Sequence, residues 1–256
     1  MIAVPDYKSF RRELDEMRSH FFDRRSSGGL PKACCLENLV SSPTFSSSFS
    51  EGKEVPILSR AKMIGILFAQ PSHSLAKEEI TPNMDYFHYR SGRNINFYCA
   101  GYGDESSLGS YEDREPVGEN ASLRWMFSTS AFNTFRSELE QRSHWRYSGE
   151  TELLLCNARL NRMATKVIPD LGVAVVCSLS KMKEDKAISS VMSLFEDIFR
   201  YAENQDPNDP TWGFSDAMAG QKSMPALKRL VLSLLPKGLG AEVERLAHLA
   251  IRDINK

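Results

Sequence analysis

The chain of 256 residues has few cysteines, almost no net charge and no long hydrophobic run. Its five cysteines form no even framework, which argues against a disulfide scaffold and for a reducing compartment. The longest apolar stretches, 63–69 and 171–177, are far shorter than the roughly 20 residues that span a bilayer. A net charge of −1 excludes a bulk electrostatic attraction to nucleic acid or to an anionic membrane. The first residues join no basic segment to an apolar run, so we expect no secretory signal and a cytoplasmic location.

The motifs of common nucleotide-binding and hydrolytic sites are also missing. The chain has no phosphate-binding Gly-rich loop followed by Lys, no Gly-x-Ser-x-Gly elbow and no His-Glu-x-x-His pair. No cysteine or histidine cluster has the spacing of zinc ligands, so we expect no metal site, and no cofactor can be named. The role of the adjacent pair Cys34 and Cys35 stays open.

What is present is the composition of a folded protein, with 41% hydrophobic and 25% charged residues. At roughly 100–200 residues per domain, the chain forms one large domain or two small ones. We divide it into an N-terminal helix with a Ser-rich connector (1–53), an α/β domain (54–205), and a loop with a C-terminal helical pair packed on that domain (206–256).

The N-terminal segment 7–22 is predicted to be a helix. Apolar residues recur there at steps of three and four between Tyr7 and Phe21, which places them on one face, and Asp6 is positioned to cap the helix. The segment 41–53 that follows is rich in serine and has no hydrophobic period, which is typical of a connector.

A β-α-β unit is predicted next. The apolar run 62–70 is typical of a strand covered on both faces, and 94–100 alternates like a second strand. Between them, Thr81 and Pro82 favour the start of a helix that Gly92 would end. The separation of the two strands fits a parallel crossover connection.

The remaining elements follow from the same kinds of pattern. Residues 103–120 hold six acidic residues and one basic residue, which indicates a solvated loop. The further expected elements are a strand at 123–127, a helix at 130–143, antiparallel strands at 151–157 and 171–179, a helix at 185–203, and two C-terminal helices at 225–235 and 241–254.

Together these elements predict an α/β fold with an open mixed sheet of about five strands and flanking helices. The order of the elements resembles that of thioredoxin-like or related sheets. The dithiol motif of thioredoxins is missing, so the resemblance concerns topology and implies no activity.

A candidate site follows from the parallel pairing of 62–70 with 94–100. Ligands of open α/β sheets bind beyond the carboxyl ends of parallel strands. The first exit carries Ser72, His73 and Ser74. The second exit carries Gly101, Tyr102, Gly103, Asp104 and Glu105. A neutral imidazole beside a carboxylate suits acid–base catalysis near pH 7, so His73, Asp104 and Glu105 are the catalytic candidates. The structural alternative is a helix cap after the first strand and a plain turn after the second.

The segment 86–93 is the densest group of reactive side chains. Arg90 and Arg93 are candidate anion clamps for a phosphate or carboxylate. The aromatic residues of 86–98 are candidates for stacking single-stranded nucleic acid. The structural alternative is an amphipathic helix with solvated arginines.

These observations favour a protein- or ligand-binding module, a non-catalytic subunit of a larger assembly or a homo-oligomer, because several amphipathic helices accompany no catalytic signature. Two alternatives stay open. One is an enzyme that uses His73 as acid–base and Arg90 or Arg93 as clamps on a small anionic substrate. The other, less favoured, is a single-stranded nucleic-acid binder.

Overall fold

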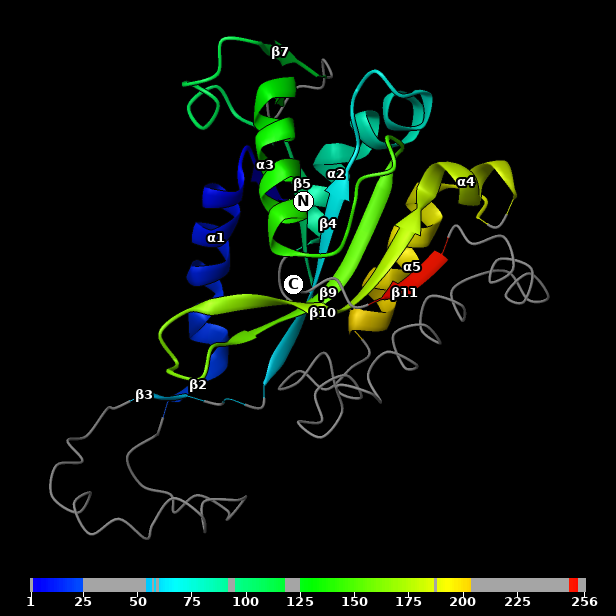
Figure 1. The fold of residues 1–256 in the computed structure, drawn as a ribbon. Helices are drawn as coiled ribbons and strands as arrows, with labels where there is room; N and C mark the ends of the chain where they lie inside the picture. The colour runs from blue at the N-terminus through cyan, green and yellow to red at the C-terminus, as the bar shows by residue number, and fades with distance from the viewer. Residues whose placement is uncertain are drawn as a thin grey trace, which may run out of the picture.

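The computed structural model describes residues 2–24, 54–56, 58, 60–91, 95–117, 125–186, 188–203 and 249–252. Within these residues, six strands form one mixed sheet in the order β1-β5-β4-β9-β10-β11 (Figure 1). Their bounds are β1 Ile2–Val4, β4 Ala61–Phe68, β5 Asn96–Ala100, β9 Glu152–Leu160, β10 Val167–Ser178 and β11 Leu249–Arg252. The chain therefore has a mixed α/β fold, as the sequence predicts, while the finer thioredoxin-like topology stays a prediction.

The two strands on which the candidate site depends are parallel, as expected. β4 pairs with β5 in the register Ile64 to Asn96 and Gly65 to Phe97. Every residue of β4 is buried, which fits its continuous apolar sequence. β1 also runs parallel to β5, whereas β9 is antiparallel to β4 and β10 is antiparallel to β9. The amino end of β9 therefore lies beside the carboxyl end of β4.

Helices cover both faces of the sheet. The helices, with short 3-10 and π segments labelled η, are α1 Tyr7–Glu16, η1 Met17–Phe21, η2 Ala76–Ile80, η3 Thr81–Asn83, α2 Met84–Arg90, α3 Thr129–Arg142, α4 Leu179–Glu184 and α5 Val191–Glu203. No helix among the described residues is long and apolar enough to cross a membrane.

The two faces can be assigned from neighbouring residues of β5, whose side chains point to opposite sides. Tyr98 packs against Phe10 of α1 at 4.9 Å between ring centroids, and Phe10 packs against Phe135 of α3 at 5.5 Å. Phe97 packs against Phe195 of α5 at 4.7 Å. Helices α1 and α3 therefore lie on one face and α5 on the other (Figure 1).

The predicted N-terminal helix is confirmed in its first part. The Asp6 carboxylate accepts a hydrogen bond from the N–H of Ser9 at 2.7 Å and caps α1. After Glu16 the chain tightens into η1. Strand β1 has no counterpart in the sequence prediction. Its residue Val4 and the α1 residues Phe10 and Leu14 belong to the same hydrophobic core as the sheet. The division at residues 53 and 205 stays a prediction.

The crossover helix begins earlier than predicted. Leu75, Ala76 and Ile80 are buried, and helical turns start directly after the turn at His73, so the chain passes through η2 and η3 before α2. Thr81 lies inside this helical stretch and makes no capping bond to η3. Gly92, the expected stop, lies outside the described residues.

The acidic segment 103–120 is more ordered than a plain loop. In its described part, 103–117, Gly103 ends β6 (Tyr102–Gly103) and Arg114–Pro116 forms β7, and both strands pair with β8 (Met126–Ser128) in a separate antiparallel sheet of order β6-β8-β7. The predicted strand near 123–127 thus exists as β8, but it belongs to this small sheet. The predicted helix 130–143 is confirmed as α3.

The antiparallel pair β9 and β10 is confirmed, and both strands are longer than predicted. The pairing of β9 with β4 ends at Arg159, and from there β9 and β10 continue as a hairpin arm, which we define as residues 159–170. The predicted helix 185–203 starts later, at Val191, because Lys186 adopts a left-handed φ of 56° and the Ser190 hydroxyl caps the N–H of Ser193 at 3.0 Å.

Most of the predicted C-terminal helical pair, 225–235 and 241–254, lies outside the described residues. Where the second helix was expected to end, the prediction is wrong, because Leu249–Arg252 forms β11 and pairs with β10. The edge of β10 would otherwise present unpaired backbone N–H and C=O groups, and a strand satisfies them where a helix does not.

Candidate functional site

The exits of β4 and β5 touch each other, as the sequence predicts. Beyond β4 the chain continues through Ala69 and Gln70 into the turn at His73. Beyond β5 it turns at Gly101, and the hydroxyl of buried Tyr102 donates a hydrogen bond to the carbonyl of Ala69 at 2.8 Å. Burial raises the pKa of the Tyr102 phenol well above its ordinary value, so this hydroxyl acts as a fixed structural donor.

A cavity of about 340 Å³ opens at the exit of β4. It is bounded by the turn after β4, by η2, by the residues before β9 and by α4. The lining residues are His73, Ser74, Leu75, Glu78, Glu79, Glu150, Ser180, Lys183 and Glu184. We call this cavity the β4 pocket. Its size is at the lower end of the range of small-ligand sites, roughly 300–1,000 Å³.

The lining of the β4 pocket is strongly acidic, since four of its side chains are glutamates and one is a lysine. Lys183 lies 2.6 Å from Oε1 of Glu79, so this pair neutralises itself. Glu78, Glu150 and Glu184 are exposed to solvent. Carboxylates gathered around a cavity raise the local concentration of cations and repel anions. The pocket therefore suits a positively charged group.

Glu79 fixes the shape of the pocket. Its Oε2 atom accepts a hydrogen bond from the N–H of Val191 at 2.6 Å, at the first turn of α5. Lys183, its ion-pair partner on α4, also donates to the carbonyl of Ser189. One carboxylate thus ties together η2, α4 and α5, and the wall that it forms is preorganised.

His73 is the sequence-predicted residue that the structure places most usefully. Its backbone N–H donates to the carbonyl of Gln70 at 3.0 Å, and its backbone carbonyl accepts from the N–H of Lys77 at 2.9 Å. These two bonds fix the turn. Its ring atom Nδ1 is buried and has no hydrogen-bond partner within the described part of the chain. Such an atom is costly unless a ligand or water satisfies it.

Two further polar side chains beside the pocket show the same feature. Thr151 Oγ1 and Ser178 Oγ are buried and unpartnered among the described residues. Thr151 is tied to the pocket wall, because its N–H donates to the hydroxyl of Ser180 at 3.3 Å and its carbonyl accepts from Leu179 at 2.8 Å. The sequence patterns did not point to this side of the site. The signal that could have found it is the antiparallel pairing of β9 with β4, which places the start of β9 beside the end of β4.

Asp104 and Glu105, the expected catalytic carboxylates, do not line the β4 pocket. Asp104 accepts hydrogen bonds from the N–H of Ser107 at 2.7 Å and the hydroxyl of Ser106 at 2.9 Å. The bonds from Ser107 hold the pKa of the Asp104 carboxyl below its ordinary value. Glu105 is exposed in the same turn. Both residues form the turn after β6, which supports the structural alternative for this exit.

The glycines of the second exit also have a structural function. Gly101 has a φ of 79°, and a Cβ at this position would lie 2.6 Å from the Cβ of Phe132. Its N–H donates to the carbonyl of Val4, and its carbonyl accepts from Ser128. A Cβ on Gly103 would overlap the hydroxyl of Ser107. This turn therefore joins the two sheets and does not form a ligand loop of the β4 pocket.

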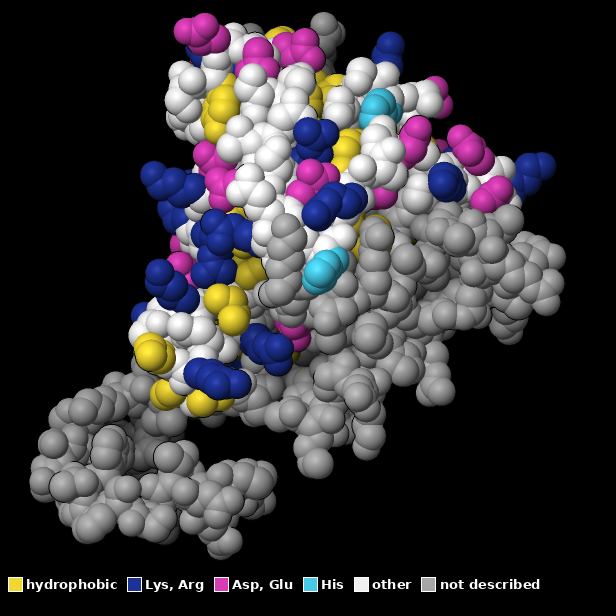
Figure 2. Space-filling view, viewed as in Figure 1, with side chains coloured by type: hydrophobic (Ala, Val, Ile, Leu, Met, Phe, Trp, Pro, Cys, Tyr) yellow, Lys and Arg dark blue, Asp and Glu magenta, His cyan; other side chains and the backbone are white. Residues whose placement is uncertain are grey.

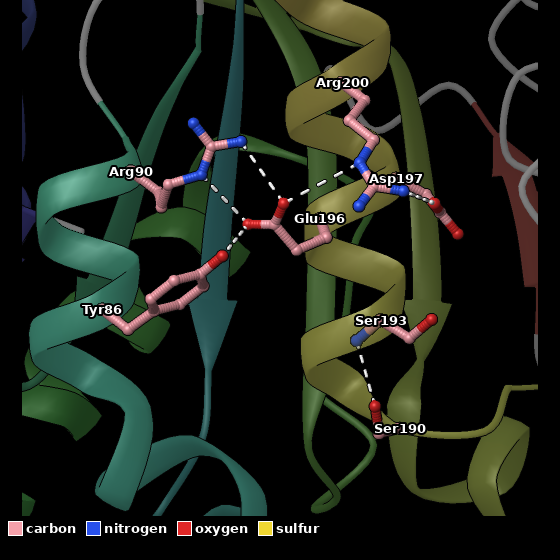
Figure 3. A network of polar contacts seen from close by, with 7 residues as sticks. All are labelled: Tyr86, Arg90, Ser190, Ser193, Glu196, Asp197 and Arg200. Carbon is pink, nitrogen blue, oxygen red and sulfur yellow. Dashed lines mark hydrogen bonds and ion pairs between the residues drawn. The ribbon is translucent and has the colours of Figure 1, made fainter.

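The guanidinium of Arg90 is already bonded to another side chain of the protein. Figure 3 shows its guanidinium and the hydroxyl of Tyr86 converging on Glu196 of α5, with Arg90 Nε 3.1 Å and Nη2 3.3 Å from the carboxylate oxygens. The same guanidinium lies 5.4 Å from the ring centroid of Phe199. These bonds hold the pKa of the Glu196 carboxyl below its ordinary value. Arg93, the second expected clamp, lies outside the described residues.

The remaining sequence candidates are placed as follows. Ser72 is exposed on the turn after β4 and does not line the β4 pocket, whereas Ser74 does. Of the aromatic residues in 86–98, the buried ones are Phe87, Phe97 and Tyr98, and the exposed ones are Tyr86 and Tyr89. Little of this segment is therefore left to stack on bases. The described part of the chain contains no group of three or more His, Cys, Asp or Glu residues that could hold a metal ion.

Comparison with known proteins identified no relative, because no protein-family model, no curated protein and no solved structure matches this chain. The function is therefore inferred from the β4 pocket and its surroundings.

Proposed function

We propose that the protein is a non-catalytic binding module whose ligand site is the β4 pocket, and that this pocket takes a positively charged side chain from a protein partner. The supporting observation is the composition of the pocket: four glutamates and one internally paired lysine around a cavity of about 340 Å³. Such a cavity has room for one or two side chains and too little for a large cofactor.

The other lining groups suit a lysine or arginine side chain. Leu75 offers an apolar contact for the aliphatic stem, because long basic side chains bury their methylene groups while the charge stays near polar partners. The carboxylates of Glu150 and Glu184 balance the charge. A guanidinium also carries five N–H donors, and the hydroxyls of Ser74 and Ser180 are acceptors for them.

The π-helix η2 supports a functional assignment for this location. Segments with π-type hydrogen bonding are uncommon and frequently occur at functional sites. Here η2 contributes two of the pocket glutamates, Glu78 and Glu79, directly after the turn that holds His73. The irregular helix therefore helps to position these carboxylates at the pocket.

A thioredoxin-like topology and a cytoplasmic location are part of the same proposal. The topology is supported by the order β4-α2-β5-α3-β9-β10-α5, with the first two strands parallel and the last two antiparallel to their neighbours. The location is supported by Cys99, Cys156 and Cys177, which are buried free thiols. Burial raises the pKa of each thiol, so none of them is a reactive thiolate and no redox activity is proposed.

The proposal is tested by titrating the full chain with fluorescein-labelled hexapeptides that carry a central Arg-Arg or Glu-Glu pair. We expect saturable binding of the basic peptide and none of the acidic one. The variant Glu150→Gln/Glu184→Gln should weaken binding at least about tenfold, the loss typical of removing charged partners. The matched control Glu112→Gln/Glu115→Gln removes the same charge from exposed positions outside the pocket. Equal weakening by both pairs, or preference for the acidic peptide, contradicts the proposal.

One observation favours a second candidate, an enzyme in which His73 acts as acid–base. His73, whose ring atom Nδ1 is buried and unpartnered among the described residues, lines the β4 pocket together with Ser74 and Ser180. The acidic lining disfavours the small anionic substrate expected from the sequence. Turnover of cationic carboxylic ester substrates by the wild type, lost in His73→Gln, would support this candidate. A wild type no faster than buffer would contradict it.

A further inference from the structure

The lining of the β4 pocket and the tip of the hairpin arm carry opposite charge, although the chain as a whole is nearly neutral. The carboxyl end of β4 holds the glutamates of the β4 pocket. At the opposite end, the hairpin arm carries Arg159, Arg162 and Lys166, and Asp170 in the arm is paired with Arg159 at 2.6 Å. Figure 2 shows Lys and Arg side chains gathered over α1 and the arm at the left and lower left, whereas Asp and Glu lie mainly in the upper and right-hand parts, with further Lys and Arg side chains among them.

The tip of the arm is rigid. The side chain of Asn161 accepts hydrogen bonds from the N–H groups of Thr165 at 2.8 Å and Lys166 at 3.1 Å. Its amide donates to the hydroxyl of Thr165 at 3.0 Å. At the base of the tip, Asp15 of α1 accepts from the N–H of Val167 at 3.0 Å. The tip is thus held in one conformation, which lowers the entropic cost of binding.

The rigid tip presents an apolar side chain between two cations. Met163 is 82% exposed, the most exposed of the large hydrophobic residues within the described chain. Arg162 and Lys166 beside it are exposed as well. An ordered, exposed methionine flanked by cations has the chemistry that the β4 pocket accepts: positive charge together with an apolar group that can contact Leu75.

We propose that the hairpin arm of one copy of this protein docks into the β4 pocket of a second copy. This inference rests on the proposed function and names the partner. It is carried by the charge complementarity between Arg162 and Lys166 at one end and Glu150 and Glu184 at the other.

The geometry makes this contact intermolecular. β9 connects the two sites, with Glu150 just before its first residue and Arg162 just after its last. Its nine residues, at 3.3–3.4 Å per residue, separate the pocket from the arm by about 30 Å. A tip therefore reaches a pocket only in another molecule. Because the two surfaces differ, the contact is head-to-tail, and each dimer retains one unused tip and one unused pocket. Wild-type assemblies should consequently grow with concentration.

The test uses sedimentation velocity of the full chain over a dilution series. We expect the wild type to sediment faster as its concentration rises, and this dependence to weaken at 1 M salt because exposed charges are screened. The tip variant, Arg162→Glu/Lys166→Glu, and the pocket variant, Glu150→Gln/Glu184→Gln, should each be monomeric. The control Lys8→Glu/Arg12→Glu makes the same charge change on α1, outside the arm, and should associate like the wild type.

Mixing the two variants is the decisive step. The tip variant keeps an intact pocket, and the pocket variant keeps an intact tip, so an equimolar mixture should form a one-to-one dimer and nothing larger. A mixture that stays monomeric, or a wild type that is monomeric at every concentration, overturns the inference. In that case the labelled basic peptide still reports on the pocket: if it binds, the proposed function stands with another partner, and if it does not, both fail.

Discussion

Glu79 on η2 and Lys183 on α4 form an ion pair of 2.6 Å across the wall of the β4 pocket. The second oxygen of the same carboxylate accepts the N–H of Val191, which begins α5. A backbone N–H at the start of a helix has no partner within the helix, so this contact satisfies a group that would otherwise be unbonded. The residue that shapes the pocket therefore also stabilises the fold.

Replacing Glu79 should destabilise the protein. We expect Glu79→Ala to lower the free energy of unfolding by about 1–2 kcal/mol, through loss of the helix-capping bond and the ion pair. Glu79→Gln should lose less, because its amide oxygen can still accept from Val191. Urea denaturation measures both. Glu78→Ala, an exposed neighbour on η2, serves as the control and should change stability by less than about 0.5 kcal/mol. Equal effects at the two positions would contradict the assignment.

The contacts of Glu196 with Arg90 and Tyr86 predict a specific dependence of stability on pH. Hydrogen bonds from Arg90 hold the pKa of Glu196 below its ordinary value. The folded state therefore prefers the ionised carboxylate, and its stabilisation is complete above the unfolded pKa of about 4.3 and lost as pH falls through the folded pKa. We expect Glu196→Gln to cost about 1 kcal/mol at pH 6 and much less at pH 3.

Thermal and urea unfolding of wild type and Glu196→Gln at both pH values checks this dependence. Tyr86→Phe is the companion variant, since it removes one donor and leaves the Arg90 pair in place. A difference between wild type and Glu196→Gln that stays constant from pH 6 to pH 3 would show that Arg90 does not stabilise the ionised form.

The sequence predicted the parts of the fold that depend on short-range patterns. The apolar run 62–70 and the alternation in 94–100 correctly indicated two parallel strands, because burial on both faces leaves a direct signature in the sequence. Strand β1 has only three residues and was missed, because its position is fixed by pairing with β5 far along the chain. Residues 249–252 were assigned to a helix from apolar spacing, and backbone pairing with β10 overrode that spacing.

The sequence predicted only part of the candidate site. The rule that ligands bind beyond parallel strands led to His73 and Ser74, which line the β4 pocket. The same rule also selected Asp104 and Glu105, which form an exposed turn. Asp104 accepts hydrogen bonds within that turn. Glu150 and Ser180 were missed, because Glu150 precedes the antiparallel strand β9 and Ser180 lies on α4 after the antiparallel strand β10, and the rule considers only the exits of parallel strands. Arg90 was selected for its charge, and nothing in the sequence shows that Glu196 pairs with it.

Gly101 should be intolerant of substitution for two independent reasons. Its φ is 79°, and a Cβ would lie 2.6 Å from the Cβ of Phe132. We expect Gly101→Ala to cost about 3 kcal/mol or more, since left-handed strain adds to the overlap with α3. Gly149→Ala is the matched control, because Gly149 has a φ of 92° but nothing within 4 Å of the position that a Cβ would occupy. It should cost only about 1 kcal/mol. Similar losses in urea denaturation would show that contact with Phe132 is unimportant.

The buried Lys62 predicts that stability rises with pH in the alkaline range. Burial lowers the pKa of Lys62 to about 8, whereas the unfolded chain binds this proton up to about pH 10.4. Between these values the unfolded state holds more protons, so stability from this group rises with pH, by about 1 kcal/mol per pH unit. The difference in unfolding free energy between wild type and Lys62→Met should therefore shift in favour of the wild type from pH 8 to pH 10.

Buried thiols titrate at alkaline pH too, but they are common to both proteins and cancel in this difference. Parallel stability curves for wild type and Lys62→Met over this range would contradict the low pKa. Lys166→Met, at an exposed position of the hairpin arm, should give such parallel curves and is the control.

The selection of cations by the β4 pocket is the claim on which both proposals depend. The direct measurement is the NMR signal of the His73 ring in histidine-labelled protein, assigned with His73→Gln and titrated with arginine amide and, separately, with inorganic phosphate. We predict a saturable shift of the His73 signal with arginine amide, weakened in Glu150→Gln/Glu184→Gln, and no shift with phosphate. A His73 signal that ignores arginine amide, or that responds to phosphate instead, would contradict the claim.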